Sequence, residues 1–269
     1  MEPILKVENL VKRYTKQNLV GVPQEFLALD SVSFTVSAGA TLAIVGESGS
    51  GKSTVASCIA CLETPTGGNL WFEGKNLAHA AENELRNLRP QIQLIFPDPA
   101  SSLNPRWTIL DIVAEPLVVQ GKLSRSERMT RAFSLLERVG LSAEIAERPA
   151  SELSGGQRQR LAIARALTLQ PKILILDEAL SALDCSVQAQ IATLLIELQS
   201  SLGMTFLFIS HDLAMAAHLA DEIAVMSRGQ IVEHGPAVKI LQTPASEATR
   251  QLLAAVPQLS HAPQPAAQR

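Results

Sequence analysis

The stretch Gly46-Glu47-Ser48-Gly49-Ser50-Gly51-Lys52-Ser53-Thr54 decides the fold of this chain. It follows the apolar segment Thr41–Val45, which predicts a buried strand, and a helix of about three turns is expected from Gly51 to the turn at Pro65–Gly68. A strand, a glycine-rich turn ending in Lys-Ser and a helix make up a phosphate-binding loop, in which backbone N–H groups and the helix N-terminus surround phosphates. In such a loop Lys52 reaches the β- and γ-phosphates, and the Ser53 hydroxyl is a ligand of Mg²⁺. We therefore predict that this stretch binds a nucleoside triphosphate and is more than a glycine-rich turn that binds nothing.

Two adjacent carboxylates follow a second apolar segment. Ile173–Leu176 predicts another buried strand, and Asp177 and Glu178 come directly after it. Asp177 can hold Mg²⁺ through water, and a second carboxylate beside that ligand can polarise the attacking water. A solvated Asp-Glu pair is the alternative, but the phosphate loop upstream favours the catalytic interpretation.

A second glycine-rich helix start occurs at Leu153-Ser154-Gly155-Gly156-Gln157. Its backbone donors, its serine hydroxyl and the positive end of the helix dipole suit another phosphate. One nucleotide does not need two such loops from one subunit. We therefore predict a head-to-tail pair of chains, with each nucleotide between one chain's phosphate loop and the other chain's Leu153–Gln157.

The rest of the chain divides into strand-rich ends and a helical middle. Short strands are expected near the N-terminus, and amphipathic helices are expected within residues 98–168, as an inserted subdomain would show. After this block, two apolar segments joined by a helix predict a β-α-β unit, and therefore a parallel strand pair. The expected elements are strands at Ile4–Val7, Val32–Val36, Leu70–Phe72 and Thr205–Ile209, a loop at Lys16–Glu25, helices at Ser124–Val139, Gln157–Leu169 and Ser186–Gln199, and a disordered tail at Val256–Arg269.

Composition narrows the function classes. The 269 residues carry a net charge of −3 and 46% hydrophobic residues, so no global positive charge indicates nucleic-acid binding. No apolar stretch approaches the roughly 18 residues of a membrane span, and no secretory signal begins the chain, so a cytoplasmic location is expected. Cys58 and Cys61 are spaced like a metal-ligand pair, but without a second pair they are expected to be core residues.

The ordered set of motifs resembles the ATPase subunits of ABC transporters, from about residue 4 to 256. The resemblance implies an α/β fold with a P-loop NTPase core, an N-terminal antiparallel β subdomain and an inserted helical subdomain at about 98–168. Residues 1–256 would form the nucleotide-binding domain, with 257–269 as a tail, and the cofactors would be ATP and Mg²⁺.

The same resemblance assigns individual roles. Glu178 and His211 would be catalytic, with His211 holding the γ-phosphate and the attacking water. Leu153, Ser154, Gly155, Gly156 and Gln157 would form the signature loop that contacts the partner's ATP, and Asp184 would belong to a loop that crosses the dimer interface. Tyr14 would stack on adenine, and a surface tyrosine at a strand end is its alternative.

One position departs from the family pattern. This chain has Phe96-Pro97-Asp98-Pro99 where the family reads Phe-Gln-Asp-Pro, and that glutamine would ligate Mg²⁺ and begin the segment touching the membrane subunits. Proline has neither a side-chain oxygen nor an N–H, and Gln93 is expected to be a strand residue that does not substitute. Our hypothesis is a slower but competent site; a catalytically weak regulatory half-site in a heterodimer is the alternative.

Three further segments resemble the peptide and nickel importer ATPases: Asp98–Arg106, Leu183–Gln190 and Thr243–Pro257. This resemblance implies a second ATP-binding subunit (a sister or a copy), two membrane permease subunits and an extracytoplasmic substrate-binding protein, with this chain at the cytoplasmic face of the inner membrane. Residues 97–112 would receive a helix of a permease. A nickel-specific importer remains an alternative, whereas an exporter is disfavoured by the tail. A non-transport ABC ATPase acting on nucleic acid or ribosomes is disfavoured because no second domain, coiled coil or basic patch is visible.

Overall fold

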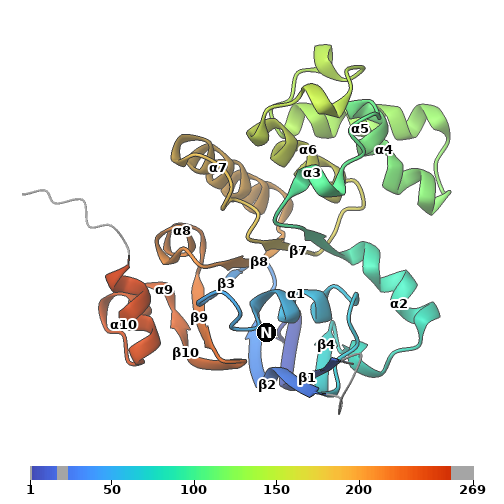
Figure 1. The fold of residues 1–269 in the computed structure, drawn as a ribbon. Coiled ribbons are helices and arrows are strands. Elements are labelled where there is room, and N and C mark those ends of the chain that lie inside the picture. Colours follow the sequence, from blue (N-terminus) through green and yellow to red (C-terminus); the bar gives the residue numbers. More distant parts are fainter. Residues whose placement is uncertain (1, 17–23, 256–269) are drawn as a thin grey trace, which may run out of the picture.

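A six-stranded, mostly parallel sheet forms the centre of the molecule (Figure 1). The computed structural model describes residues 2–16 and 24–255. The strands of this sheet are β3 (Thr41–Val45), β6 (Ile92–Ile95), β7 (Ile173–Asp177), β8 (Thr205–Ser210), β9 (Glu222–Ser227) and β10 (Gln230–Pro236). Their order is β10-β9-β3-β8-β7-β6, and every neighbouring pair is parallel except β9 and β10. The predicted parallel pair, β7 and β8, is confirmed.

A second, antiparallel sheet is built from the N-terminal part of the chain. Its strands are β1 (Leu5–Lys16), β2 (Gln24–Val36), β4 (Gly67–Phe72) and β5 (Lys75–Asn76), in the order β2-β1-β4-β5. The prediction of short strands here was wrong, because cross-strand pairing extends the hairpin through polar residues as far as Lys16 opposite Gln24. The ends of the expected loop are therefore strand residues, and positions 17–23 lie outside the described residues, as does the tail at 256–269.

Helices cover both faces of the central sheet. The longer ones are α1 (Lys52–Ile59), α2 (Glu82–Leu88), α4 (Ile109–Gln120), α5 (Arg125–Arg138), α6 (Gly155–Leu167), α7 (Cys185–Leu202), α8 (Leu213–Leu219) and α10 (Glu247–Ala254). Shorter helices and single turns are α3 (Pro99–Ser102), α9 (Ala237–Gln242), Leu77–His79, Arg89–Gln91, Ala143–Ile145 and Ala150–Glu152. Figure 1 shows α1 between the two sheets and α4 to α7 on the opposite side. Within the described residues, no helix combines the length and apolar character that a membrane crossing requires.

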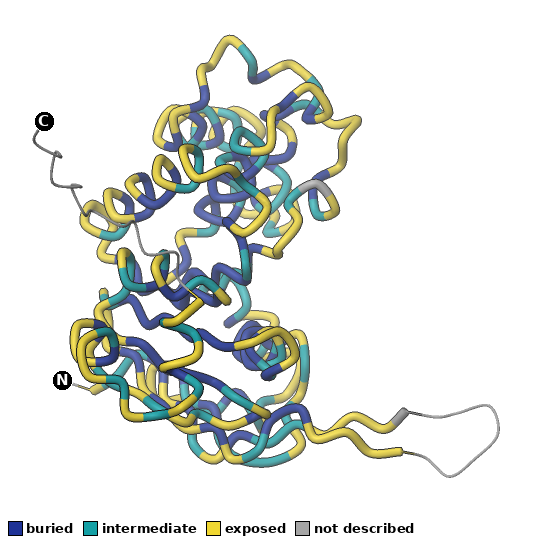
Figure 2. The backbone as a smooth tube through the Cα atoms, turned by 60° about the vertical axis from the view of Figure 1, so that its left-hand side comes forward, coloured by how far each residue is buried: buried dark blue, intermediate teal, exposed yellow. Residues whose placement is uncertain are grey.

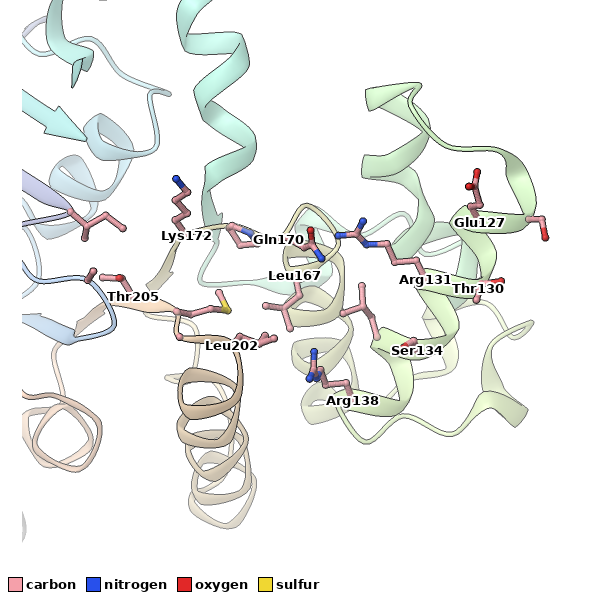
Figure 3. Close-up of a pocket in the computed structure, with 17 residues that line it drawn as sticks. Glu127, Thr130, Arg131, Ser134, Arg138, Leu167, Gln170, Lys172, Leu202 and Thr205 are labelled. Atoms are coloured by element: carbon pink, nitrogen blue, oxygen red, sulfur yellow. The ribbon is translucent and has the colours of Figure 1, made fainter. Parts of the chain in front are cut away.

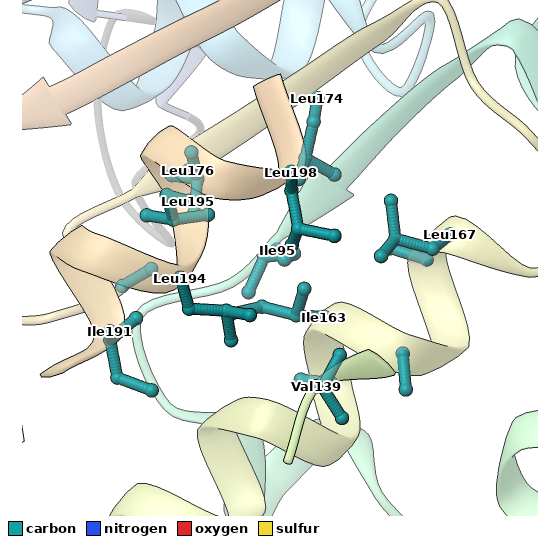
Figure 4. Packing of buried hydrophobic residues seen from close by; sticks show 14 of the residues in the cluster. Ile95, Val139, Ile163, Leu167, Leu174, Leu176, Ile191, Leu194, Leu195 and Leu198 are labelled. Carbon is teal, nitrogen blue, oxygen red and sulfur yellow. The ribbon is translucent and has the colours of Figure 1, made fainter. Parts of the chain in front are cut away.

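Two hydrophobic cores lie on opposite faces of the central sheet. One packs α4 to α7 against the sheet, with Leu174 and Leu176 of β7 facing Leu195 and Leu198 of α7 (Figure 4). The other fills the space around α1 and contains the alternate strand residues, such as Ile175. The buried strands run as a dark band through the molecule, with exposed segments outside it (Figure 2). This burial on both faces explains why β3 and β7 are continuous apolar runs.

The first helix is shorter than its sequence indicated. Helix α1 has eight residues and ends at Ile59, so the expected three turns are closer to two. Cys61 lies past the helix end, in a left-handed backbone conformation with φ of 56°. Cys58 and Cys61 are buried, and burial raises the pKa of both thiols to about 11. The burial of both side chains confirms the expectation that they are core residues. Thiols that stay protonated are also unreactive.

Besides the four-residue helix α3, the helical middle contains one longer helix that was not expected. Helices α5 and α6 agree with the predicted helices to within two residues at each end, whereas α4 begins at Ile109, inside the segment 97–112 that was expected to contact a permease. Ile109 is fully buried, because α4 packs against α5 and α6. The Thr168 hydroxyl, at the end of α6, donates a hydrogen bond of 3.0 Å to the Val113 carbonyl of α4. The limits 98–168 of an inserted subdomain remain a prediction.

Candidate functional site

The loop between β3 and α1 is shaped by glycines that pack against neighbouring backbone. A Cβ at Gly46 would lie 2.1 Å from the Met226 carbonyl oxygen, and Gly51 adopts φ of 104° with Ala28 O at 2.6 Å from its would-be Cβ. Only glycine fits both positions. The loop is also tied to the turn after β9, because the Gly229 N–H donates to Ser50 O at 2.9 Å. The backbone of this loop is therefore fixed from outside by β2 and β9.

Lys52 is a buried cation at the centre of the loop. Its side chain is enclosed, with the residue 4% exposed, and Nζ donates to the carbonyl oxygens of Gly46 and Glu47 at 2.8 Å each. Burial lowers the pKa of Lys52, and the carboxylates of Glu178 and Asp177 act in the opposite direction. The ammonium group is therefore held where the loop, β7 and the residue after β7 converge.

Ser53 and Asp177 meet across the site. The Ser53 Oγ donates to Asp177 Oδ1 at 3.1 Å, which joins the first turn of α1 to the end of β7. Burial raises the pKa of Asp177, and the hydrogen bond from Ser53 partly offsets this. A hydroxyl and a carboxylate at this separation are hard oxygen ligands of the kind that Mg²⁺ takes in combination with phosphates and waters. Among the described residues, no group of three or more His, Cys, Asp and Glu side chains could hold a metal alone.

Glu178 and His211 form the second polar pair. Glu178 has a left-handed backbone with φ of 45°, which is uncommon for a non-glycine residue, and its N–H donates to Ile209 O at 2.9 Å. Its Oε1 lies 3.5 Å from His211 Nδ1. Both residues line a small cavity of about 60 Å³ beyond the ends of β7 and β8. The strained backbone thus directs a half-buried carboxylate toward the histidine.

A cavity of about 280 Å³ opens beside the phosphate loop. Its lining includes most of the predicted loop together with four residues from elsewhere. The lining residues are Phe26, Ala28, Ser48, Gly49, Gly51, Lys52, Ser53, Thr54, Pro97 and Glu178. Pro97 therefore faces the site, as its place in the sequence suggested. Gln93 is a residue of β6 and donates to Arg89 O, as expected for a strand residue that does not substitute for position 97.

The predicted aromatic, Tyr14, lies on β1 directly opposite Phe26 of β2. The Lys12 ammonium sits 4.9 Å from the centroid of the Tyr14 ring, whereas Phe26 is 59% exposed and lines the cavity. Sequence reasoning missed Phe26. The available signal was an aromatic residue upstream of the phosphate loop, on what the structure shows to be β2.

The signature residues and the loop at Asp184 lie side by side, apart from the phosphate loop of the same chain. Ser154 caps α6, with its Oγ accepting from the Gln157 N–H at 3.3 Å and its own N–H donating to Gln157 Oε1 at 3.0 Å. A Cβ at Gly156 would lie only 2.6 Å from Val187 Cγ1 of α7, whose first turn is capped by Asp184. Of the described residues that line the 280 Å³ cavity, none belongs to Leu153–Gln157.

An apolar groove of about 360 Å³ runs between β6, α4 and α6. Large side chains are exposed along it: Leu62 at 56%, Phe96 at 44% and Val119 at 75%. An ion pair between Arg165 and Glu115, 2.7 Å long, spans its floor. Phe96 and residues of α4 within 115–120 line the groove. The expected contact segment, residues 97–112, contributes only Ser102 to this lining.

Comparisons with known proteins agree with this geometry. A family model described as ABC transporter matches residues 29–181. The chain is 45% identical over 259 residues to the dipeptide transport ATP-binding protein DppF of Haemophilus influenzae, covering 96% of this chain and 79% of that protein. It is 48% identical to the probable peptide ABC transporter ATP-binding protein y4tS of Sinorhizobium fredii, covering 95% and 73%. The glutathione import ATP-binding protein GsiA of Escherichia coli is also 48% identical, but the chain spans only 41% of its length.

Solved structures are similar over most of the chain. The dimeric post-hydrolysis state of the ATP-binding cassette MJ0796, bound to ADP and Pi, has a TM-score of 0.77 and 32% identity, covering 87% of this chain and 98% of that one. The cbiO1 protein of Clostridium perfringens, part of the transporter complex cbiONQ, also has a TM-score of 0.77, with 30% identity and coverage of 89% and 91%. The expected fold class is therefore confirmed.

Proposed function

The chain belongs to the ABC transporter family, and we propose that it is the ATP-binding and ATP-hydrolysing subunit of an importer for peptides. The proposal for peptides rests on the relatives, whose names specify dipeptide, peptide and glutathione. The nickel alternative has no such support among these three. In the proposed arrangement residues 1–256 form one nucleotide-binding domain, and the helices of about 98–168 form its inserted subdomain.

One observation supports hydrolysis most directly: the groups needed for phosphoryl transfer converge on the phosphate loop. Lys52 is held at the loop's centre, Ser53 and Asp177 are 3.1 Å apart, and Glu178 lies within 3.5 Å of His211. Lys52 would neutralise charge on the β- and γ-phosphates. Glu178 would orient and polarise the attacking water, and His211 would contact both the γ-phosphate and that water. Tyr14 or Phe26, opposite each other on β1 and β2, would stack on adenine.

Ser53 and Asp177 are the residues that would hold Mg²⁺. Bound Mg²⁺ would offset the negative charge of the phosphate oxygens. The oxygen-only chemistry of this pair fits a hard cation, and a bound cation would favour the ionised form of Asp177, whose pKa burial raises. Within this chain, the hydrogen bond between Ser53 and Asp177 holds the two residues that would bind the ion 3.1 Å apart.

The signature loop would act on a partner's nucleotide. Residues 153–157 are not among the described residues that line this chain's own phosphate cavity, and the starts of α6 and α7 pack together, with Gly155 against Leu183 and Gly156 against Val187. A head-to-tail pair of chains would place this surface over the phosphate loop of the other chain. The capped Ser154 would keep its hydroxyl in position for the γ-phosphate while still closing the helix.

The apolar groove between β6, α4 and α6 would receive a helix from a permease subunit. Exposed Phe96 and Val119 supply the apolar contacts, and the Arg165–Glu115 pair ties α6 to α4 beneath them. Phe96 lines the groove and the next residue, Pro97, lines the nucleotide cavity, so the groove and the site share this segment of the chain. The complete assembly would contain a second ATP-binding subunit, two permeases and an extracytoplasmic binding protein, with this chain peripheral at the cytoplasmic face of the inner membrane.

The test is the substitution Glu178→Gln in the purified chain with its partner subunit. We expect ATP hydrolysis to fall by at least about a hundredfold while ATP binding is retained, because the amide keeps the shape but cannot accept a proton. Glu147→Gln, an exposed carboxylate on a turn remote from the site, is the matched control and should hydrolyse at the normal rate. Unchanged turnover in Glu178→Gln would remove the assigned role. In cells, loss of labelled dipeptide uptake with normal nickel uptake would support the peptide substrate, and the reverse result would contradict it.

A further inference from the structure

A separate cavity of about 830 Å³ lies between α5 and the edge of the central sheet (Figure 3). Its walls are α5 on one side and, on the other, the segments that enter β7 and β8, including Lys172, Met204 and Thr205. The parallel strands run away from this edge, with Asp177 as the last residue of β7 and His211 directly after β8 at the opposite ends. The cavity and the phosphate loop are therefore at opposite edges of one sheet.

Two arginines face this cavity without a counter-ion. Arg131 and Arg138 are seven residues apart on α5, so they lie on one face, separated by two helical turns or roughly 10 Å. Figure 3 shows both guanidinium groups extending from α5 across the gap, toward Gln170 and Leu202. Neither side chain makes an ion pair or hydrogen bond with any residue in the described ranges 2–16 and 24–255.

The other charged residues of the lining are already engaged. Lys172 Nζ contacts both Glu73 carboxylate oxygens at 2.6 and 2.7 Å. Glu127 accepts from the Ser124 N–H in the capping box of α5, and these contacts with Ser124 hold the pKa of Glu127 below its usual value. Arg131 and Arg138 are therefore the charged residues of the lining that pair with no described residue, while Glu127 keeps a negative charge near the start of α5.

The floor of the cavity is apolar. Leu167 and Met204 are 3% and 4% exposed, and Leu135, Leu202 and Pro171 continue the surface on either side. A cavity of a few hundred to about 1,000 Å³ that combines an apolar floor with a few convergent polar groups has the usual composition of a small-molecule site. Its chemistry differs from that of the phosphate loop, where backbone donors dominate.

We propose that this cavity binds a small amphiphilic anion, with its acidic head between Arg131 and Arg138 and its alkyl part on Leu167 and Met204. Guanidinium groups suit carboxylate or phosphate heads because they donate two parallel hydrogen bonds. The head contacts α5, whereas the alkyl part contacts the segments before β7 and β8. A bound anion thus ties the helical layer to the central sheet, at a site that neither the nucleotide nor the proposed permease contact uses.

The experiment measures binding of octyl phosphate, below its micelle concentration, to the full chain by calorimetry. The phosphate loop is first filled with the non-hydrolysable ATP analogue AMP-PNP, so that the probe is excluded from it. Ethyl phosphate and octyl glucoside test the alkyl part and the charge separately. The variants are Arg131→Gln/Arg138→Gln and Thr130→Trp, which places a large ring in the cavity from the exposed face of α5. Arg125→Gln, on the same helix but outside the lining, is the matched control.

We expect octyl phosphate to bind the wild type and Arg125→Gln equally, and its dissociation constant to rise at least about tenfold in both cavity variants. Hydrogen exchange should show α5 and the start of β7 protected by the probe in the wild type and in Arg125→Gln, but not in the two cavity variants. Equal binding by the double arginine variant would overturn the proposal, as would equal binding of ethyl phosphate or octyl glucoside. Binding of phosphatidylglycerol vesicles without binding of monomeric octyl phosphate would also overturn it. None of these outcomes depends on ATP hydrolysis or peptide uptake.

Discussion

Substituting Gly156 with alanine should destabilise the chain, although alanine is the better helix former. The added Cβ would lie 2.6 Å from Val187 Cγ1, whereas non-bonded carbons prefer about 3.5–4.0 Å. Helices α6 and α7 must therefore separate by about 1 Å locally, or Val187 must leave its rotamer. Overpacking of this kind costs about 1–3 kcal/mol, and the gain in helix propensity offsets at most about 1 kcal/mol. We expect a net loss of about 1–2 kcal/mol in the free energy of unfolding.

A double-mutant cycle in urea isolates this contact. Val187→Ala removes the methyl groups that the new Cβ would meet, so Gly156→Ala should be nearly neutral in the Val187→Ala background. The coupling free energy should be about 1–2 kcal/mol, read from transition midpoints at constant m-value. Gly203→Ala, which tests a glycine with nothing near its would-be Cβ, separates crowding from backbone conformation. Additive effects of Gly156→Ala and Val187→Ala would refute the reasoning, because no steric conflict would then exist.

Three further outcomes are expected. Burial raises the pKa of Glu233, but hydrogen bonds from Thr249, Ala245 and Ser246 outweigh it and hold the pKa below its usual value. The stabilisation that these hydrogen bonds give to the folded chain is present above the unfolded pKa of about 4.3, and it is lost as pH falls through the lower pKa of the folded state. Amide exchange of α10 should therefore become faster in acid. Glu233→Gln should abolish that pH dependence. Pro97→Gln should raise the ATPase rate severalfold at limiting Mg²⁺, and an unchanged rate would show that position 97 is not limiting. Val119→Asp should weaken association with the permease by at least about tenfold in a pull-down while leaving ATP binding intact; normal association would exclude the groove as the contact.

The central strands could be predicted because their signal is local. Thr41–Val45 and Ile173–Leu176 are continuous apolar runs, and the structure places them as β3 and β7 within one residue of the expected limits. Helix α5 was equally accessible, because its apolar residues recur at helical spacing between charges. Helix α4 was missed for the opposite reason: it is apolar on most of its surface, contains Pro116 and follows a proline-rich segment.

The candidate site was predictable in its residues and unpredictable in its geometry. The phosphate loop and Asp177 follow from motif and strand order, because parallel strands bring their carboxyl ends to one edge. The left-handed backbone of Glu178 has no local signal, and it occurs together with a hydrogen bond to Ile209 on the neighbouring strand. The contact between Gly156 and Val187 joins residues of two helices separated by a strand, so only the packed structure reveals it.

The two cores on opposite faces of the central sheet make strand register intolerant of insertions and deletions. In β8, Phe206 and Phe208 belong to the core under α7, whereas Leu207 and Ile209 belong to the core around α1. Because side chains alternate along a strand, removing one residue from β8 would exchange the two sets and place phenylalanine rings in the space of aliphatic side chains. A shift of one residue in the register of a single strand would therefore disrupt the packing of both cores. In the regular parallel strands β7 and β8, residue type can therefore vary but residue number cannot, whereas changes of length are compatible with the connections between them.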